Sequence, residues 1–495
     1  MAVSALQALD LSAEQRKTLN RLLRRFVPNA AVWAYGSRVK WTAQPHSDLD
    51  LVVLGPTADT AYVADLRDAL MESDLPFPVD VHVWDELPAS FRQNIEAEHV
   101  VIQTAASDLP SPPEHWRRST WGREVSLEYG KSLRGYHPHQ GKVRVYGSNG
   151  PIGWTGVALA PGPGVVLGRK GAYRGVEFSR DPFFVIDTAY YFVPKSDLDM
   201  RWLYYAAIAD RLGEIDDGSP GPSTTRAAVY MQPIVVPPPS EQRAIADLLE
   251  SLDAKIELNR RMNATLEAMA RALFQSWFVD FDPVRSKLDA RPAAALDPAT
   301  AALFPDSFDH EVDGAVPKGW TLKRWGDIVT LEYGRSLRDY RENGGRYRVF
   351  GTNGPIGFND EPLCNSAGVV IGRKGAYRGV HYSPEPFFVI DTAFYLRPKT
   401  ALDLKWAYYE LLRFDINSMD SGSAIPSTSR DDFYGIPVVV PPPQIQEEFG
   451  KMVGGWFATM FANDHQSRTL ATLRDALLPK LLSGELRVSA AERLA

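Results

Sequence analysis

Two aspartates near the start of the chain have the residue type and spacing that metal-dependent phosphate chemistry requires. Asp48 and Asp50 are separated by one residue and lead into the apolar run LVVL at 51–54. Alternate side chains of a β-strand point to the same side, so we expect both carboxylates on one face. Such a pair can hold Mg²⁺ ions that bridge a triphosphate and polarise the reacting phosphorus. Asp80, in the later strand-like segment PVDVHVWDEL, is the candidate third carboxylate.

The stretch WAYGSRVKWTAQPHSDLDLVVLG (33–55), with PVDVHVWDEL (78–87), resembles the minimal nucleotidyltransferases of the polymerase β superfamily. The resemblance implies that Gly36 and Ser37, with Arg38, begin a helix after a strand and hold nucleotide phosphates. It also implies that Asp80 helps to activate an incoming hydroxyl. ATP and Mg²⁺ are the implied cofactors, and the implied reaction transfers AMP to a protein hydroxyl or a nucleic-acid end.

The residues after this glycine–serine pair depart from the family pattern. Val39, Lys40 and Trp41 stand where the pattern usually has a small or basic residue and glycine. A domain that keeps the fold, has lost catalysis and only mediates protein contacts is therefore an alternative. We interpret the flanking His46 and His82 as scaffold or phosphate-side residues, not as zinc ligands.

Most of the remaining chain is a duplication with an offset of 204 residues. GVVLGRKGAYRGV (164–176) returns as GVVIGRKGAYRGV (368–380), and residues 125–195 are roughly 60% identical to residues 329–399 without a gap. Each copy consists of short strand-like runs punctuated by Gly, Pro and Asn, with one helical segment. The pattern predicts two copies of an α/β domain of about 130 residues.

Basic and amide side chains gather in both copies, where glycines let a ligand approach the backbone closely. Arginine and lysine can meet phosphates or guanine edges, and asparagine suits adenine. The candidate DNA contacts are Arg134, Arg144, Ser148, Asn149, Arg169, Lys170, Tyr173, Arg174, Arg338, Arg348, Thr352, Asn353, Arg373, Lys374, Tyr377 and Arg378. The alternative is that the glycine-rich turn is a framework that the fold needs whatever the target.

The net charge of −7 hides a division along the chain. Residues 109–239 carry 15 basic and 12 acidic side chains, and residues 317–443 carry 16 and 14. The segments 1–108 and 240–316 each have a net charge of −6. Local charge decides whether a surface can meet phosphates, and the positive segments are those with the repeat.

Each copy is followed by a segment with heptad-like apolar spacing. One seam holds Ile245, Leu252, Asn259, Leu266 and Leu273, and its counterpart holds Phe449, Trp456, Asn463, Leu470 and Leu477. A single polar residue in such a seam costs stability but fixes register and partner. We favour two long helices that pack together, parallel or antiparallel. The alternative is that each helix packs only on its own domain.

Residues 110–490 resemble a type I restriction–modification specificity subunit. The resemblance rests on VPPPSEQRAI, LNRRMNATLEAMARALFQSWFVDFDPVRSK, VPKGW and LRDALLPKLLSGELRV. It implies two DNA target-recognition domains, each followed by a long helix, with the helices paired antiparallel. It also implies two methyltransferase subunits as partners, which bind S-adenosylmethionine, and optionally restriction–translocase subunits. The sequence also indicates that methylation and cleavage come from partner chains. It lacks the G-x-x-x-x-G-K-[ST] loop of helicase-type ATP hydrolysis and the Asn/Asp-Pro-Pro-aromatic segment of an adenine methyltransferase.

The expected fold class is multidomain α/β: a nucleotidyltransferase-like domain, then two duplicated recognition domains joined by an antiparallel coiled coil. The expected boundaries are domain 1–106, linker 107–115, recognition domain 116–239, helix 240–282, connector 283–316, recognition domain 317–443, helix 444–487 and tail 488–495.

The duplication predicts a bipartite, nearly palindromic DNA target with a non-specific spacer. An alternative is an antitoxin-like nucleotidyltransferase that uses the repeats to find DNA. The single cysteine, Cys364, fits a reducing cytoplasm. No apolar run is long enough to span a membrane, so we expect a cytoplasmic protein without a membrane partner.

Overall fold

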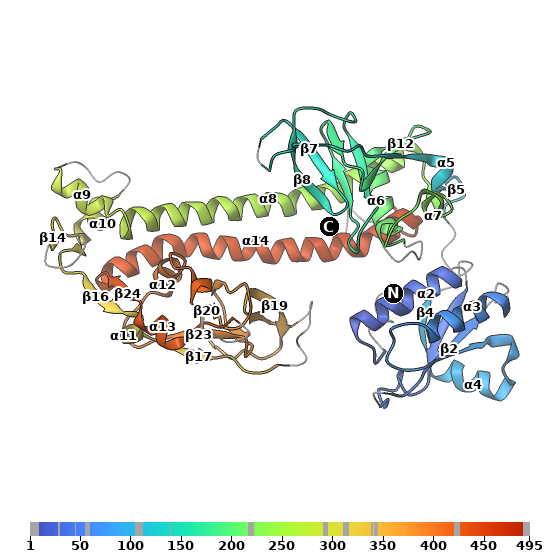
Figure 1. The fold of residues 1–495 in the computed structure, drawn as a ribbon, viewed down its shortest axis with the longest axis horizontal. Helices are drawn as coiled ribbons and strands as arrows, with labels where there is room; N and C mark the ends of the chain where they lie inside the picture. Colours follow the sequence, from blue (N-terminus) through green and yellow to red (C-terminus); the bar gives the residue numbers. More distant parts are fainter. Residues whose placement is uncertain are drawn as a thin grey trace. The chain divides into compact units, whose positions relative to one another are not determined.

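The computed structural model describes residues 9–27, 30–44, 46–54, 60–103, 112–138, 140–215, 222–290, 296–309, 316–337, 340, 345–419 and 426–488. The chain divides into two compact units, residues 1–250 with 475–495 and residues 251–474 (Figure 1). No helix in the described part of the chain is long and apolar enough to cross a membrane.

The front domain is a four-stranded mixed sheet with helices. The strands lie in the order β3-β2-β1-β4. β2 pairs parallel with β3, and β1 pairs antiparallel with β2 and β4. The element bounds are α2 Ala13–Phe26, β1 Ala31–Tyr35, β2 Leu49–Leu54, α3 Thr60–Met71, β3 Val79–Val83, α4 Ala89–Ala97 and β4 Val100–Gln103.

Local sequence explains how this domain begins. Ser12 caps α2: its hydroxyl accepts from the Gln15 backbone N–H, and the Gln15 side chain accepts from the Ser12 N–H. This reciprocal arrangement satisfies two N–H groups that a helix start leaves open. Leu19 and Leu23, one turn apart, are fully buried and join the core beneath the sheet.

The first recognition domain contains a four-stranded sheet of order β10-β9-β12-β6, a three-stranded sheet of order β11-β7-β8 and the pair β13-β5. Its bounds are β5 Arg117–Thr120, α5 Trp121–Glu124, β6 Val125–Tyr129, β7 Val143–Gly147, β8 Gly150–Thr155, β9 Gly164–Gly168, β10 Val176–Ser179, β11 Phe183–Val185, β12 Ala189–Pro194, α6 Met200–Ala209, η2 Leu212–Glu214, α7 Arg226–Tyr230 and β13 Pro233–Val236.

The second recognition domain repeats this topology strand for strand, with sheets β17-β23-β20-β21, β19-β18-β22 and β16-β24. The predicted duplication of an α/β domain is therefore confirmed. Its bounds are β16 Thr321–Arg324, α11 Trp325–Ile328, β17 Val329–Tyr333, β18 Tyr347–Gly351, β19 Gly354–Asn359, β20 Gly368–Gly372, β21 Val380–Ser383, β22 Phe387–Val389, β23 Ala393–Pro398, α12 Leu404–Leu411, η3 Ile416–Ser418, α13 Arg430–Gly435 and β24 Pro437–Val440.

Two long helices follow the domains, α8 Pro239–Phe278 and α14 Pro443–Ser483. Asp253 of α8 meets Arg474 of α14 at 2.6 Å, whereas Asn263, farther along α8, meets Asp464, earlier in α14, at 2.9 Å. Contacts that advance along one helix and retreat along the other define an antiparallel pair. Of the two orientations left open by the sequence, the structure therefore has the antiparallel one.

The predicted polar position lies inside this helix pair. Asn259 is fully buried and Asn463 is 9% exposed. The Asn259 Nδ2 donates to the Ser467 hydroxyl at 3.2 Å, and the Asn463 Nδ2 donates to Asn263 Oδ1 at 2.9 Å. Residues 263 and 467 are also 204 apart, so the two bonds are equivalent under the repeat. A local two-fold relation between the helices follows.

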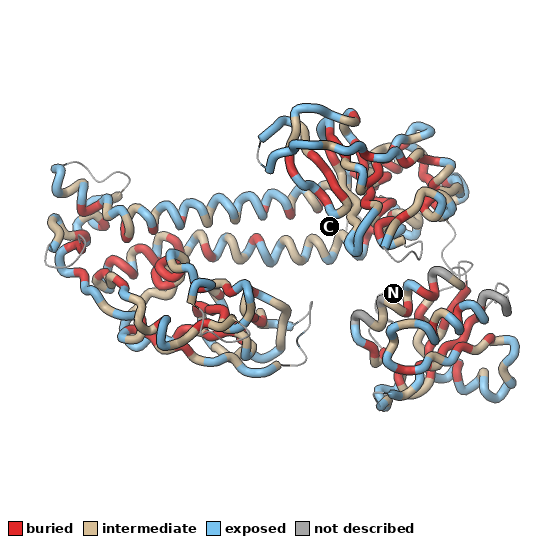
Figure 2. Tube along the Cα trace, viewed as in Figure 1, coloured by how far each residue is buried: buried red, intermediate tan, exposed pale blue. Residues whose placement is uncertain are grey.

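Part of the predicted seam is wrong in the second half of α8. Leu266 and Leu273 are only half-buried, whereas Ala270, Phe274 and Trp277 are buried. These side chains belong to one core with aromatic residues of the second domain. The helix rotates its buried face because an α-helix drifts from a strict seven-residue repeat and because its end packs on a domain as well as on a helix. Figure 2 shows buried residues near the end of α8.

Each long helix ends four residues before the sequence-based boundary, at Phe278 and Ser483. Gly484 directly follows α14 with a φ of 78°, in the left-handed region that commonly ends a helix. Phe281, three residues after α8, has a φ of 56° and precedes α9. The connector between the domains carries α9 Asp282–Leu288, α10 Pro298–Leu303 and the short pair β14 Phe308–Asp309 with β15 Val316–Pro317.

Candidate functional site

Asp50 is the centre of the acidic site in the front domain. In the sheet register it lies opposite Asp80 of β3 on one side and opposite Tyr35 of β1 on the other. Residues paired across strands share a face of the sheet. Asp48 lies just before β2 and is exposed, as is Asp80. The fold therefore brings together the two strands that carry the predicted carboxylates.

The neighbouring carboxylates affect the ionisation of Asp50. Partial burial raises the pKa of the Asp50 carboxyl, and the negative charges of Asp80 and Asp48 raise it further, while His82 acts in the opposite direction. Burial, together with Asp50 and Asp80, raises the pKa of the Tyr35 hydroxyl to about 12. Concentrated negative charge of this kind attracts a cation.

Gly36 is the position at which a side chain is excluded. Its φ is +83°, and a Cβ built there would lie 2.1 Å from Asp50 Oδ2. The loop therefore passes directly over the carboxylate, which is a close approach that only glycine allows.

Two expectations for the segment after Gly36 are wrong. Residues 37–41 form hydrogen-bonded turns instead of a helix, with the Thr42 N–H donating to the Ser37 carbonyl. Arg38 is 4% exposed, so its guanidinium does not face a nucleotide. It donates to the carbonyls of Ser47 and Asp10 and lies 3.7 Å from the centre of the Phe77 ring. Arg38 thus holds the loop that presents the aspartates.

Within the described residues, no three carboxylate, imidazole or thiol groups lie close enough to enclose a metal ion by themselves. The donor set still fits Mg²⁺, because hard oxygen ligands are paired in the sheet register and the charges of Asp80 and Asp48 raise the pKa of Asp50. An ion shared between Asp48 and Asp50 would complete its coordination with oxygens of a bound triphosphate and water.

The glycine-rich turn of the first recognition domain is tied to two neighbouring loops. The Gly175 N–H donates to the Ser148 carbonyl at 2.8 Å, and the Gly171 N–H donates to the Pro222 carbonyl at 3.0 Å. A Cβ on Gly168 would lie 2.1 Å from the Ser148 carbonyl oxygen, so glycine is required there. The Ser148 hydroxyl donates to the Thr188 carbonyl at 2.7 Å and is used in the framework. The proposed base contact through Ser148 is therefore not supported.

Two arginines predicted to contact DNA instead stabilise these turns. Arg174 donates to the carbonyls of Gly213 and Gly171. Its counterpart Arg378 is 4% exposed and donates to four carbonyls, those of Gly375, Ile416, Asn417 and Met419. These guanidiniums are directed at backbone carbonyls of their own domain, and that of Arg378 is also nearly inaccessible to a ligand. For Arg174 and Arg378, the structure therefore supports the alternative that the turn is a framework needed by the fold whatever the DNA target.

Other predicted residues of the turn face outward in both copies. Tyr173 and Tyr377 are 76% and 78% exposed at the tips of their turns. Four more of the predicted DNA-contacting side chains are exposed nearby: Lys170, Lys374, Asn149 and Asn353. Thr352 differs, since its hydroxyl is buried without a hydrogen-bond partner. The exposed tyrosines, lysines and asparagines therefore remain candidate DNA contacts.

The remaining predicted arginines lie in varied settings. Arg134 is exposed, and Arg144 lies 4.5 Å from the centre of the Trp154 ring. Arg348 contacts Asp464 at 3.4 Å and lies against Phe461, so the helix α14 contributes to its surroundings. Arg338 lies outside the described residues.

Beside the predicted Arg169 and Arg373 lie four residues that the sequence analysis missed: Tyr129, Arg226, Tyr333 and Arg430. Arg169 and Arg226 both contact the Tyr129 ring, and Arg373 and Arg430 both contact the Tyr333 ring. These missed residues sit in the matched segments LEYG and PST-x-R of the two copies. The repeat itself was the signal that could have found them.

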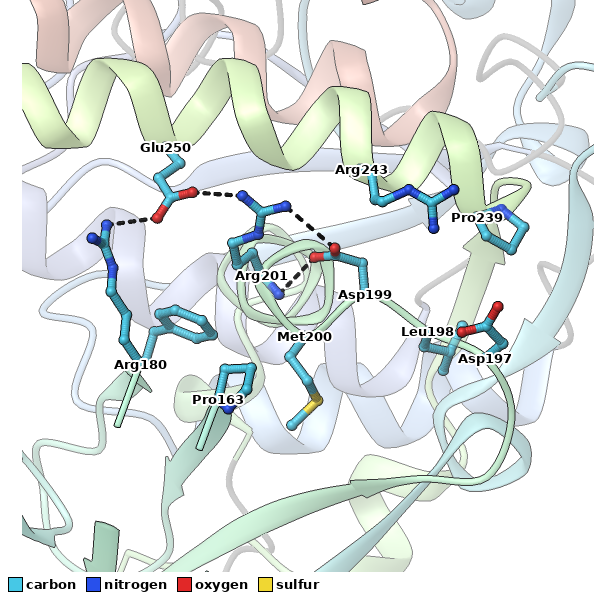
Figure 3. Close-up of a pocket in the computed structure, with 11 residues that line it drawn as sticks. Pro163, Arg180, Asp197, Leu198, Asp199, Met200, Arg201, Pro239, Arg243 and Glu250 are labelled. Carbon is cyan, nitrogen blue, oxygen red and sulfur yellow. Dashed lines mark hydrogen bonds and ion pairs between the residues drawn. The ribbon is translucent and has the colours of Figure 1, made fainter. Parts of the chain in front are cut away.

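A cavity of about 440 Å³ lies between the first recognition domain and the beginning of α8. Figure 3 shows Glu250 bridging Arg180 and Arg201, while Arg201 also reaches Asp199. The hydrogen bond with Glu250 raises the pKa of the Arg201 guanidinium above its usual range. The charges of Glu250, Arg180, Arg201 and Asp199 are already paired within the protein, so we interpret this cavity as part of the contact between domain and helix.

Family models match two parts of the chain. The model described as "Polymerase beta, Nucleotidyltransferase" matches residues 17–107. The model described as "Type I restriction modification DNA specificity domain" matches residues 149–268 and 317–453. The second model thus covers the first repeat from residue 149, the whole second repeat and the first parts of both long helices.

Curated relatives follow the same division. The type I restriction enzyme MjaIX specificity subunit of Methanocaldococcus jannaschii is 25% identical over 413 residues, which are 76% of this chain and 90% of that protein. The probable protein adenylyltransferase MntA of Haemophilus influenzae is 37% identical over 105 residues, which are 21% of this chain and 92% of that protein.

Among solved structures, the type I restriction–modification S subunit of M. genitalium superposes with a TM-score of 0.51 at 19% identity. The match covers 74% of this chain and 96% of that one. At this identity the similarity concerns the fold.

Proposed function

Because the chain belongs to the type I restriction–modification DNA specificity family, with a nucleotidyltransferase domain at its front, we propose that its two recognition domains read the two halves of a bipartite DNA site. One observation carries this proposal. The same turn framework, with the same outward-facing tyrosine, lysine and asparagine, occurs twice, and the helices that follow are paired antiparallel. Duplex DNA presents two half-sites related in the same two-fold manner.

Partners supply the chemistry on DNA. We propose two methyltransferase subunits, each with its own S-adenosylmethionine, and optionally restriction–translocase subunits. The shared framework of the two domains favours a nearly palindromic target. The loops at 135–142 and 155–163 differ between the copies and allow partial differences between half-sites. A DNA target and the single cysteine fit the cytoplasm.

Methylation mapping tests the specificity function. The chain is co-expressed with the methyltransferase subunit from its own system in a host without adenine methylation, and modified adenines are mapped by long-read sequencing. We expect one bipartite, nearly symmetric motif. Two unrelated half-sites would contradict the symmetry, and absence of methylation from a confirmed complex would contradict the specificity function.

For the front domain we propose Mg²⁺-dependent transfer of AMP from ATP to a protein hydroxyl. The observation that favours it is the register of Asp50 with Asp80 under Gly36. Mg²⁺ bound by Asp48 and Asp50 would neutralise the triphosphate and polarise its α-phosphorus. Asp80 would take the proton of the acceptor hydroxyl as its oxygen bonds to that phosphorus and pyrophosphate leaves.

Transfer of label from α-³²P-ATP to proteins of the same operon tests this activity. The full chain is compared with Asp48→Ala/Asp50→Ala and with Asp74→Ala, an exposed carboxylate outside the site. We expect label transfer by the wild type and by the control only. No transfer by the wild type would support the alternative of an interaction domain without catalysis.

A further inference from the structure

The two copies share a cluster of positive side chains gathered around one aromatic ring, which we name the arginine–tyrosine cluster. In the first recognition domain it consists of Arg169, Arg226 and Tyr129. The guanidinium carbons lie 5.0 and 4.0 Å from the centre of the ring. Arg169 and Arg226 come from segments 57 positions apart, so the fold brings together two like charges.

The second recognition domain rebuilds the cluster with Arg373, Arg430 and Tyr333. Here the guanidinium carbons lie 4.7 and 5.0 Å from the centre of the ring. A second aromatic ring, Tyr190 in one copy and Phe394 in the other, packs 5.0 Å from the tyrosine in each domain. The same geometry with different neighbours indicates an arrangement that both domains need.

The positive charge of the cluster is largely uncompensated. In the described parts of the chain, the nearest carboxylate contact to any of the four arginines is Glu128, at 3.9 Å from Arg226. Its counterpart Glu332 pairs instead with Arg397. The Nε atom of Arg226 is also buried without a hydrogen-bond partner. Two guanidiniums that contact one ring and have little carboxylate compensation suit an anion.

The cluster is fixed in position and open to the solvent. Arg169 and Arg373 donate to the carbonyls of Asp187 and Asp391, at 3.2 and 2.9 Å. The rings of Tyr129 and Tyr333 are 46% and 49% exposed. A side chain that already donates to a backbone carbonyl of its domain loses little conformational freedom when a ligand binds.

We propose that each arginine–tyrosine cluster binds a phosphate of the DNA backbone next to its half-site. The cluster adjoins the outward-facing turn, since Arg169 directly precedes Lys170 and Arg373 directly precedes Lys374. Its residues are the same in both copies, whereas the loops at 135–142 and 155–163 differ. Phosphate contacts carry no sequence information. Residues that are identical in the two copies, beside loops that differ between them, suit such a contact. This inference rests on the proposed DNA function.

The test is the salt dependence of DNA binding by the complex with methyltransferase subunits, on the duplex that the methylation map defines. Each phosphate contact contributes about 0.9 to the slope of log affinity against log salt. We expect Arg226→Gln/Arg430→Gln to reduce the slope by about 2 in magnitude. Between 50 and 200 mM salt the wild type should lose about tenfold more affinity than the variant.

The matched control removes the same two charges, one from each domain, at Arg180→Gln/Arg397→Gln. Arg180 is 68% exposed and reaches Glu250, and Arg397 is 73% exposed. Arg397 lies opposite Thr330 in the sheet register, on the other face from Tyr333, because side chains alternate along β17. We expect this control to keep the wild-type slope.

Single variants locate the contact. In phosphate-ethylation interference, Arg226→Gln should abolish the effect at one phosphate beside one half-site, and Arg430→Gln at the equivalent phosphate beside the other.

If a glutamine variant fails to fold, the Lys variants, which keep the charge, should fold and keep the slope with weaker binding. An unchanged slope in the glutamine variants, loss of slope in the lysine variants or a changed methylation motif would overturn the proposal. Absence of DNA binding by the wild type would instead refute the DNA function itself.

Discussion

The Asn259 Nδ2 donates to the backbone carbonyl of Asn463 at 3.3 Å, and these two residues occupy the same position of the repeat. A residue that meets its own counterpart lies on the local two-fold axis of the helix pair. The Asn259 Oδ1 is buried there without a hydrogen-bond partner. The axis is therefore marked by a polar group that costs stability, as expected for a residue that fixes register.

Replacement of this asparagine pair should stabilise the helix pair but loosen its control of register and partner. Asn259→Leu/Asn463→Leu removes the buried unpaired oxygen, which should raise the free energy of unfolding by about 1 kcal/mol. The helices should then also pair out of register or between molecules. Urea unfolding and light scattering measure both effects, and Thr265→Leu on the exposed side of α8 is the control. A double variant that is less stable, or that stays uniform, would contradict the assigned role.

Arg378 and Lys374 should behave differently although they lie four residues apart in the same turn. Arg378→Ala leaves four buried or half-buried carbonyls without their donor, so unfolding of the second domain should become easier by about 3 kcal/mol. Lys374→Ala removes an exposed side chain and should leave stability within about 0.5 kcal/mol. Hydrogen exchange in β20 and β21 distinguishes them. Equal stability of both variants would refute the framework role of Arg378.

Gly36→Ala should separate the two functions of the chain. The new Cβ would clash with Asp50 Oδ2 and demand a left-handed backbone. The loop should therefore move, with loss of AMP transfer by at least tenfold and an unchanged methylation motif. Gly135→Ala, a left-handed glycine with no neighbour near its Cβ, shows the effect of backbone strain alone. Loss of methylation in Gly36→Ala would mean that the front domain controls the specificity part.

Asp50 should make the front domain less stable as the pH rises. Its carboxyl has a raised pKa in the folded state, so the fold favours the protonated form. The resulting stability is present below the ordinary value of 3.8 and is lost as the pH rises through the raised pKa. Asp50→Asn should therefore exceed the wild type in stability at pH 7, with the difference vanishing near pH 4.

Hydrogen exchange of peptides from β1 and β2, in the full chain without Mg²⁺, measures this difference. Asp74→Asn should show none. Addition of Mg²⁺ should stabilise the wild type more than Asp50→Asn, because only the wild type has the complete carboxylate pair. A difference that grows toward low pH would contradict the sign of the shift.

The repeat offset predicted most of the architecture, because residues that match at 204 positions must form the same strands. It also predicted the buried asparagines, since a polar residue in both seams stands out against apolar neighbours. The sequence could not separate Arg174 and Arg378 from Arg169 and Arg373, because all four look alike in RKGAYR. Three of the four carbonyls that accept from Arg378 belong to residues 38 to 41 positions away.

The same limitation explains the error at Arg38. Its partners, the carbonyls of Asp10 and Ser47, come from the start of the chain and from the far end of its own loop. A local motif cannot show that a guanidinium points inward, because its direction depends on which backbone carbonyls the tertiary fold leaves without donors. The predicted aspartates, in contrast, lie on regular strands, where alternation fixes the direction of a side chain.

The two-fold pairing of α8 and α14 makes their contact surface self-complementary. A surface of this kind forms equally well between two molecules, where its occupancy would depend on protein concentration. Joining both halves in one chain, through the connector and the second folded domain, converts the association into an intramolecular step. The chain therefore stays paired however scarce it is in the cell, and the two domains can diverge separately without exchanging partners.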